Sequence, residues 1–221
     1  MGPWSFSRLS AFRQCPRQFY ELKIERNFQE TVHPTTAWGS RGHKALELRV
    51  RDGEPLPSEF SYLESFAQKI IAMPGQMSCE LELACTEDLT PVAFNSPEAW
   101  ARGIIDLFKF KDTEAVALDY KFGKVKPSDQ LKQNALLIFA NFPTVRTVKT
   151  KFLWLAHRET TDGEYHREDA SALWQDFKPI VEQLKQAHEG GIWTERPSGL
   201  CKAHCPVTTC QYHGIGNKRR Y

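Results

Sequence analysis

The sequence lacks the features of a membrane or secreted protein. No run of apolar residues approaches the roughly 18 that a membrane-spanning helix needs. The N-terminal stretch has no apolar segment of the kind that forms the centre of a secretory signal. We therefore expect a soluble protein of the cytoplasm with no membrane partner.

A strong net charge and internal repetition are missing as well. The formal net charge is +2, which is too small to indicate a nucleic-acid-binding protein by itself. No internal repeat or low-complexity tract separates one part of the chain from another. With 221 residues, of which 41% are hydrophobic, the chain is long enough to bury a sizeable core. We predict a single domain over residues 1–221.

What the sequence does contain is a predicted hairpin that carries charged residues among apolar ones, from Ala101 to Lys124. Apolar and polar residues alternate on both sides of a short polar turn, which predicts two paired strands. Successive strand side chains point to opposite faces, so Asp119 and Lys121 share one face and Tyr120 lies on the other. If the strands pair so that Asp106 lies near Asp119, three charged groups converge on one patch of an apolar sheet.

Two carboxylates on such a patch indicate a metal site. Asp106 and Asp119 would be costly to bury in ionised form without a compensating cation. Magnesium prefers oxygen ligands and retains several waters. Lys121 beside the metal could then steady or deprotonate an attacking water. The alternative is an exposed hairpin whose charges are solvated.

The remaining pattern predicts an α/β protein. Strands are expected at residues 78–86 and 147–156 in addition to the hairpin. Helices are expected over residues 5–14, 17–24, 35–52, 58–72, 127–142 and 168–189, the last with a kink at Pro179.

Four short motifs follow one another along the chain in a recognisable order. They are G-x3-H from Gly39 to His43, G-I-I-D ending at Asp106, D-Y-K-F-G-K from Asp119 to Lys124, and Gln130. This set resembles the RecB-like branch of the PD-(D/E)xK nucleases. The resemblance implies a restriction-endonuclease-like core, in which helices flank a central mixed β-sheet.

The resemblance also implies roles for individual residues. It implies Mg or Mn bound by His43, Asp106, Asp119 and the backbone carbonyl of Tyr120. It implies catalytic roles for Asp106, Asp119, Lys121, Glu80 and Gln130. One position departs from the family pattern, because the last residue of its Q-x3-Y motif is Asn134 here.

Basic residues occur near these motifs and near the start of the chain. We predict phosphate contacts at Arg17, Lys124 and Lys126, which would make DNA the partner. Most surface lysines are simply solvated, so this clustering is compatible with phosphate contacts and also with a solvated surface.

Three cysteines fall within ten residues near the C-terminus, at Cys201, Cys205 and Cys210. In a chain without a secretion signal, such clustering favours metal ligands over disulfides. Cys15 as fourth ligand would give a four-thiolate site suited to an iron-sulfur cluster. His213 as fourth ligand would give a zinc site of local spacing.

The cysteine segments also carry a resemblance. CPRQFYEL, which begins at Cys15, and the tail CKAHCPVTTC resemble the split cysteine set of family members that carry a 4Fe-4S cluster, although the family spacing C-x2-C-x5-C is C-x3-C-x4-C here. The implied cluster is a clasp between N-terminal helices (about 5–26) and a C-terminal segment (about 197–221). By contrast, Cys79 and Cys85 alternate with leucines and are interpreted as core residues.

The resemblance implies a metal-dependent DNA exonuclease that hydrolyses phosphodiester bonds at single-stranded or duplex DNA ends in recombination or repair. One alternative is a nuclease of the same fold in CRISPR spacer acquisition. Another is a non-catalytic DNA-binding module with a structural iron-sulfur or zinc site. Recombination or CRISPR proteins would be the protein partners, and the sequence does not determine the oligomeric state.

Overall fold

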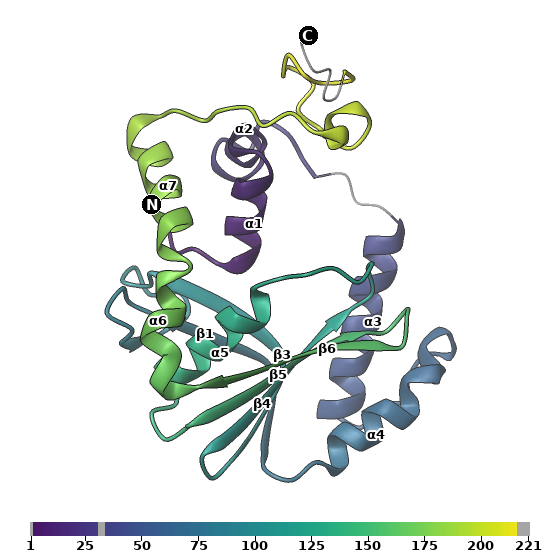
Figure 1. Cartoon of the computed structure of the whole chain (residues 1–221). Helices are drawn as coiled ribbons and strands as arrows, with labels where there is room; N and C mark the ends of the chain where they lie inside the picture. The colour runs from purple at the N-terminus through teal and green to yellow at the C-terminus, as the bar shows by residue number, and fades with distance from the viewer. Residues whose placement is uncertain (1, 31–33, 216–221) are drawn as a thin grey trace. The chain divides into compact units, whose positions relative to one another are not determined.

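The computed structural model describes residues 2–30 and 34–215. These residues form two compact units (Figure 1). We call the described part of Pro3–Val32 and Phe177–Tyr221 the helical unit, and the described part of His33–Asp176 the sheet unit. Within these residues, no helix is both long and apolar enough to cross a membrane.

The sheet unit is built on a six-stranded sheet in the order β2-β1-β3-β4-β5-β6. The strands are β1 (Gln76–Cys85), β2 (Pro91–Val92), β3 (Ala101–Lys111), β4 (Glu114–Lys121), β5 (Thr147–Trp154) and β6 (Glu159–His166). β4 and β5 pair in parallel, and the other neighbouring strands pair antiparallel. Parallel strands need a crossover connection, which helix α5 (Gln130–Asn141) provides. The prediction of a mixed sheet flanked by helices is confirmed.

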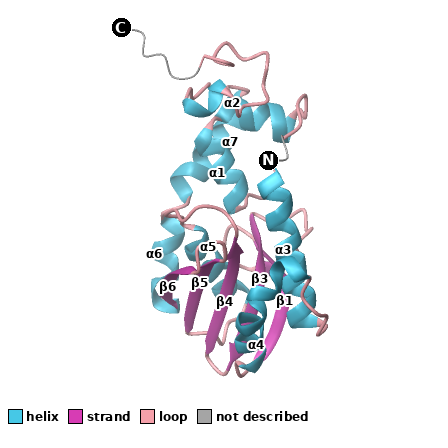
Figure 2. Ribbon diagram, turned by 90° about the vertical axis from the view of Figure 1, so that its right-hand side faces the viewer, coloured by secondary structure: helices cyan, strands magenta, loops and turns pink. Residues whose placement is uncertain are grey.

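Different helices cover the two faces of this sheet (Figure 2). Helix α3 (Pro34–Arg51), the 3-10 helix η2 (Ser58–Leu63) and helix α4 (Glu64–Ala72) contribute to the core on one face. β4 adds Val116, Leu118 and Tyr120 to that core. The intervening side chains of Ala117, Asp119 and Lys121 therefore lie on the face where Leu131 of α5 packs with Phe152 and Trp154. The predicted alternation along β4 is confirmed.

Strands β2 and β6 were not predicted from the sequence. β6 reads Glu-Thr-Thr-Asp-Gly-Glu-Tyr-His and has no buried residue, so it shows no apolar face for the pattern to reveal. It is an edge strand, where charged side chains discourage pairing with another chain.

The prediction of one continuous helix over residues 168–189 is wrong. The segment forms a 3-10 turn, η3 (Arg167–Asp169), and two helices, α6 (Ala170–Gln175) and α7 (Lys178–Gly190). The interruption precedes Pro179, which lies in the first turn of α7. A proline is tolerated in the first turn because its missing N–H would be unpaired there anyway, so Pro179 starts a helix and does not kink one.

The helical unit combines both ends of the described chain. It contains α1 (Phe6–Gln14), α2 (Pro16–Phe19), the π-helical turn η1 (Tyr20–Ile24), α7, and the 3-10 helix η4 (Gly199–Lys202). Ser5 caps α1 by accepting a hydrogen bond from the Arg8 N–H, as its sequence position predicts. An aromatic group made of Phe12, Phe19, Tyr20 and Trp193 fills the space between the two chain segments. The last six residues of the predicted cysteine segment lie outside the described residues.

Candidate active site and cysteine pocket

The candidate active site begins where β3 and β4 separate. Their pairing runs from Lys111↔Glu114 to Leu107↔Leu118 and then stops. Beyond that point, the Tyr120 N–H donates to Asp106 Oδ2 at 2.7 Å. A buried N–H without an acceptor would be costly, so the carboxylate takes the place of a strand carbonyl. This bond fixes Asp106 next to the end of β4.

Asp119 is joined to Lys121 by an ion pair and to Gln130 by a hydrogen bond. Its side chain is only 2% exposed, and its Oδ1 lies 2.6 Å from Lys121 Nζ. Gln130, the first residue of α5, donates from Nε2 to Asp119 Oδ2 at 2.5 Å. Lys121 Nζ in turn donates to Gln130 Oε1 at 3.0 Å. The structure thus brings together three residues that the sequence placed in one site.

His43 reaches the same site from helix α3. Its Nδ1 lies 3.2 Å from Asp106 Oδ2, and its ring packs against the rings of Tyr120 and Phe122. Burial lowers the pKa of His43, but the hydrogen bond and the charge of Asp106 outweigh it, so the pKa is raised. A surface pocket beside the imidazole is lined by Gly39, Ser40, His43, Tyr120, Lys121, Phe122 and Gly123.

The electrostatics of Asp119 reflect a shortage of positive charge. The pKa of Asp119 is raised to about 6, first by burial and then by the charge of Asp106, and Lys121 and His43 only partly oppose this effect. Two carboxylates held this close with one lysine form an environment that a bound cation would stabilise.

Glu80 lies opposite Asp106 in the middle of β1. The β1–β3 pairing is continuous on both sides but is interrupted at this one position. Glu80 has a φ of 50°, a left-handed conformation that is strained for a residue with a side chain. Burial raises the pKa of Glu80, with further contributions from the charges of Asp106 and Glu47. Its carboxylate is therefore within electrostatic reach of the site.

The side chains of the site carry atoms that commonly bind a divalent cation. In this structure, these atoms form ion pairs and hydrogen bonds within the site. Across residues 2–30 and 34–215, no three His, Cys, Asp or Glu side chains form a ready-made metal site. Asp106 engages His43 and the Tyr120 N–H, and Asp119 engages Lys121 and Gln130. Carboxylate oxygens and an imidazole are a donor set suited to Mg or Mn.

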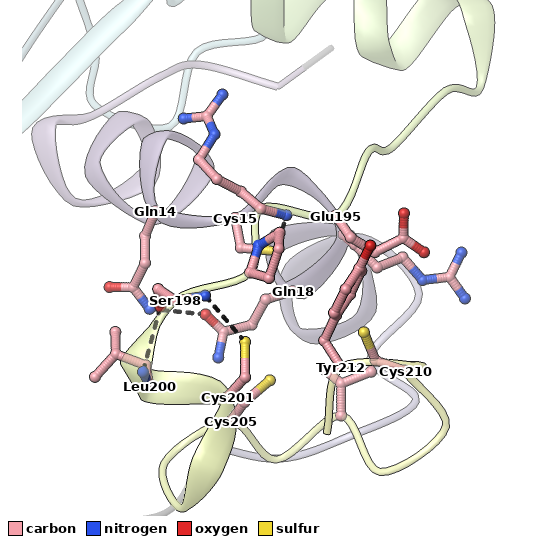
Figure 3. A pocket seen from close by; sticks show the side chains of 14 residues that line it. Gln14, Cys15, Gln18, Glu195, Ser198, Leu200, Cys201, Cys205, Cys210 and Tyr212 are labelled. Carbon is pink, nitrogen blue, oxygen red and sulfur yellow. Dashed lines mark hydrogen bonds between the residues drawn. The ribbon is translucent and has the colours of Figure 1, made fainter. Parts of the chain in front are cut away.

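The four cysteines singled out in the sequence line one pocket of the helical unit (Figure 3). They are Cys15, Cys201, Cys205 and Cys210, and all are free thiols. Cys15 Sγ accepts from the Arg196 N–H and Cys201 Sγ from the Ser198 N–H, each at 3.4 Å. His213, the alternative fourth ligand, is not among the lining residues.

The remaining two cysteines are in the sheet unit and belong to the core, as predicted. Cys85 is fully buried, and Cys79 packs against the core under α3 and α4. Burial raises the pKa of both thiols, which makes them poor sources of thiolate.

The predicted DNA contacts have different surroundings. Lys124 and Lys126 are exposed in the loop between β4 and α5, whose ends are joined by the Lys121–Gln130 bond. Arg17 instead forms an ion pair with the buried Glu21 at 2.6 Å and lies over the Tyr20 ring. It therefore has a structural role in neutralising Glu21.

Sequence reasoning missed Phe122, which packs between α3 and the end of β4. The only signal for it is a pair of glycines, Gly39 and Gly42, inside a helical pattern. Glycines are disfavoured within helices, so two of them three residues apart indicate a close approach by another group.

Comparison with known proteins gives a match over almost the whole chain. A sequence profile described as the PD-(D/E)XK nuclease superfamily matches residues 3–211. No curated protein sequence matches the chain.

Among solved structures, the chain is similar to a protein from Eubacterium rectale provisionally described as an exonuclease. The TM-score is 0.54 at 9% sequence identity, over 88% of this chain and 84% of that one. It is also similar to the protein SSO0001, with a TM-score of 0.46 at 13% identity over 96% of this chain and 88% of that one. At such low identity, the first of these similarities concerns the fold alone.

Proposed function

The chain belongs to the PD-(D/E)XK nuclease superfamily, and on this premise we propose that it is a metal-dependent deoxyribonuclease that hydrolyses phosphodiester bonds at DNA ends. The observation that carries the proposal is the bonded group of Asp106, Asp119, Lys121, Gln130 and His43 at the separated ends of β3 and β4. We call this group the active-site cluster.

Mg or Mn would be held by Asp106, Asp119, His43 and the Tyr120 carbonyl. When bound, the metal would lower the pKa of a water and offset the negative charge that develops on the scissile phosphate. The shortage of positive charge around Asp119 supports this assignment, because its pKa is raised to about 6 by burial and by Asp106. Glu80 lies near enough to influence Asp106 and would assist.

Lys121 and Gln130 would act on the attacking water. Lys121 Nζ is held between Asp119 and Gln130, so its ammonium is fixed in direction before substrate arrives. A fixed donor costs little reorganisation during the reaction, which favours electrostatic stabilisation of the transition state. Gln130 would hold the water against this lysine.

Lys124 and Lys126 would contact phosphates next to the scissile one. Both side chains are exposed, and the loop that carries them starts and ends at residues of the active-site cluster. Contacts to phosphates position a nucleic acid without reading its sequence. We therefore expect little sequence preference.

The experiment that tests this function compares linear and circular DNA in Mg, in Mn and in chelator. We expect cleavage of linear DNA that needs a metal ion, slow or no cleavage of circles, and loss of activity in Lys121→Ala. The matched control is Lys111→Ala, because Lys111 lies at the opposite end of the same strand pair. Equal activity of Lys121→Ala and the control would refute the catalytic assignment, and equal cleavage of circles would refute the preference for ends.

We also propose that the cysteine pocket holds a 4Fe-4S cluster through Cys15, Cys201, Cys205 and Cys210. The placement of all four thiols on one pocket supports this, as do the backbone N–H groups that donate to Cys15 and Cys201. Hydrogen bonds to sulfur stabilise thiolate and tune clusters of this kind. The cluster would join the two chain segments of the helical unit and place the protein in the RecB-like branch.

A further inference from the structure

Helix α3 contains two glycines where a helix former would be expected. Gly39 and Gly42 lie well inside the helix Pro34–Arg51, and glycine destabilises a helix interior relative to alanine. At both positions, an added Cβ atom would lie next to the side chain of Phe122. A Cβ at Gly42 would lie 2.6 Å from Phe122 Cε1 and closer still to Cζ, and one at Gly39 would lie 3.3 Å from Phe122 Cβ. We call this recess the glycine notch.

The Phe122 ring contacts three other aromatic rings beside the notch. Trp38 meets it edge to face with ring centroids 5.0 Å apart, and Phe60 meets it at 6.1 Å. The His43 ring lies 5.6 Å from it. An alanine at position 42 would meet the far end of the Phe122 ring, so this ring and the His43 ring packed against it would have to shift.

Phe122 is joined directly to the active-site cluster. It follows Lys121, whose carbonyl accepts from the Leu155 N–H at 2.8 Å and so ties the end of β4 to the sheet. On its other side it contacts His43, one residue beyond Gly42 on α3. The spacing between the strand that carries Asp119 and Lys121 and the helix that carries His43 therefore depends on how deeply this ring is seated.

We propose that Phe122, seated in the glycine notch, is a positioning residue that sets the distance between His43 and the carboxylates of Asp106 and Asp119. The inference rests on the proposed function, because it concerns the same metal site. Gly39 and Gly42 then contribute to the geometry of the metal site as well as to packing of the core.

The experiment combines Gly42→Ala, Phe122→Ala and the double variant, measuring kcat and KM on linear DNA and Mn²⁺ binding by electron paramagnetic resonance without DNA. For Gly42→Ala we expect kcat to fall by about 10- to 100-fold with KM nearly unchanged, because small misplacements are expensive in catalysis. Mn²⁺ affinity should fall by about tenfold, as for other losses of ligand support.

The double variant separates positioning from general damage. In the Phe122→Ala background the ring is gone, so Gly42→Ala should cause no further loss of kcat or Mn²⁺ affinity. In that background, Gly42→Ala should also raise the melting temperature, because alanine favours the helix. In the parent protein, the same substitution should lower the melting temperature. If Gly42→Ala does not fold, Gly39→Ala provides the milder test, with smaller changes of the same sign.

Two outcomes would overturn the inference. A Gly42→Ala protein with a lower melting temperature but parental kcat and Mn²⁺ affinity would assign Phe122 to packing alone. Additive losses in the double variant would show that the two positions act separately. A parent protein that neither binds Mn²⁺ nor cuts DNA would instead refute the proposed function, and the inference with it.

Discussion

The two candidate sites of this protein hold their reactive groups in different ways. In the sheet unit, groups of opposite charge bond to one another, as Lys121 does to Asp119 and His43 to Asp106. In the helical unit, four like groups line a pocket, and the bonds to Cys15 and Cys201 come from backbone N–H groups. The active-site cluster has internal partners for its charges, whereas deprotonated cysteines would repel one another.

This difference predicts how each site depends on its metal. Opposite charges that pair internally retain their arrangement when the metal is absent, so the sheet unit should fold without Mg or Mn. Thiolates that line one pocket would need a cation to be stable together, and metal binding would then contribute directly to folding. The experiments below test this contrast.

The largest expected effect is loss of cleavage in Asp119→Asn. The amide cannot bind a cation as the carboxylate does or hold Lys121 by charge, so activity should fall by at least about 1,000-fold. The melting temperature should not fall, because a buried carboxylate with an adverse environment has been removed. Asp112→Asn, in the β3–β4 turn, is the control and should leave activity unchanged. Substantial activity in Asp119→Asn would contradict the assignment.

The next effect concerns iron in the helical unit. Anaerobically purified protein should be brown and contain about four irons per chain, and Cys205→Ser should lose most of that iron and unfold about 4–8 °C lower, which is ~2 kcal/mol for a chain of this size. Metal analysis and thermal unfolding check both. Cys79→Ser, in the sheet unit, should keep the iron. Zinc in place of iron would refute the cluster, and a metal-free parent protein would refute the site.

A smaller effect is expected for the lysines of the β4–α5 loop. If Lys124 and Lys126 each contact one phosphate, replacing both with alanine should reduce the slope of log affinity against log salt by about 1.8 for duplex DNA. Binding is measured in Ca²⁺ to avoid cleavage. Lys111→Ala at the far end of the strands should leave the slope unchanged, and an unchanged slope in the double variant would remove these lysines from the DNA interface.

The smallest expected effect is a loss of stability at acidic pH that depends on Glu64, on the surface of the sheet unit. Hydrogen bonds from Arg49 and then Gln68 lower the pKa of Glu64 to about 2. Because the pKa of Glu64 is lowered by the fold, its ionised carboxylate stabilises the folded state at pH values above about 4.5. This stabilisation is lost as the pH falls from about 4.5 to about 2. Glu64→Gln should therefore unfold at a lower temperature than the parent at pH 7, by a modest margin that narrows toward pH 2. Glu98→Gln is the control, and a gap that does not change with pH would contradict the linkage.

The sequence was a good guide wherever the information is local. Alternation along β4 placed Asp119 and Lys121 on one face and Tyr120 on the other, and the structure agrees. It was a poor guide to β6, whose polar edge position leaves no pattern, and to the break before Pro179, which a helical period alone does not reveal. In these two segments, neighbours in space decide the structure.

The sequence by itself therefore determined which residue types alternate on which strands, and that the chain matches a nuclease superfamily. Only the tertiary structure decided that Asp106 accepts from the Tyr120 N–H, that Gln130 joins Asp119 to Lys121, and that Phe122 fills the glycine notch. The physical reason is that side-chain direction follows from the backbone repeat, a local property. Contacts between distant segments depend on strand register and helix packing, which the whole fold sets.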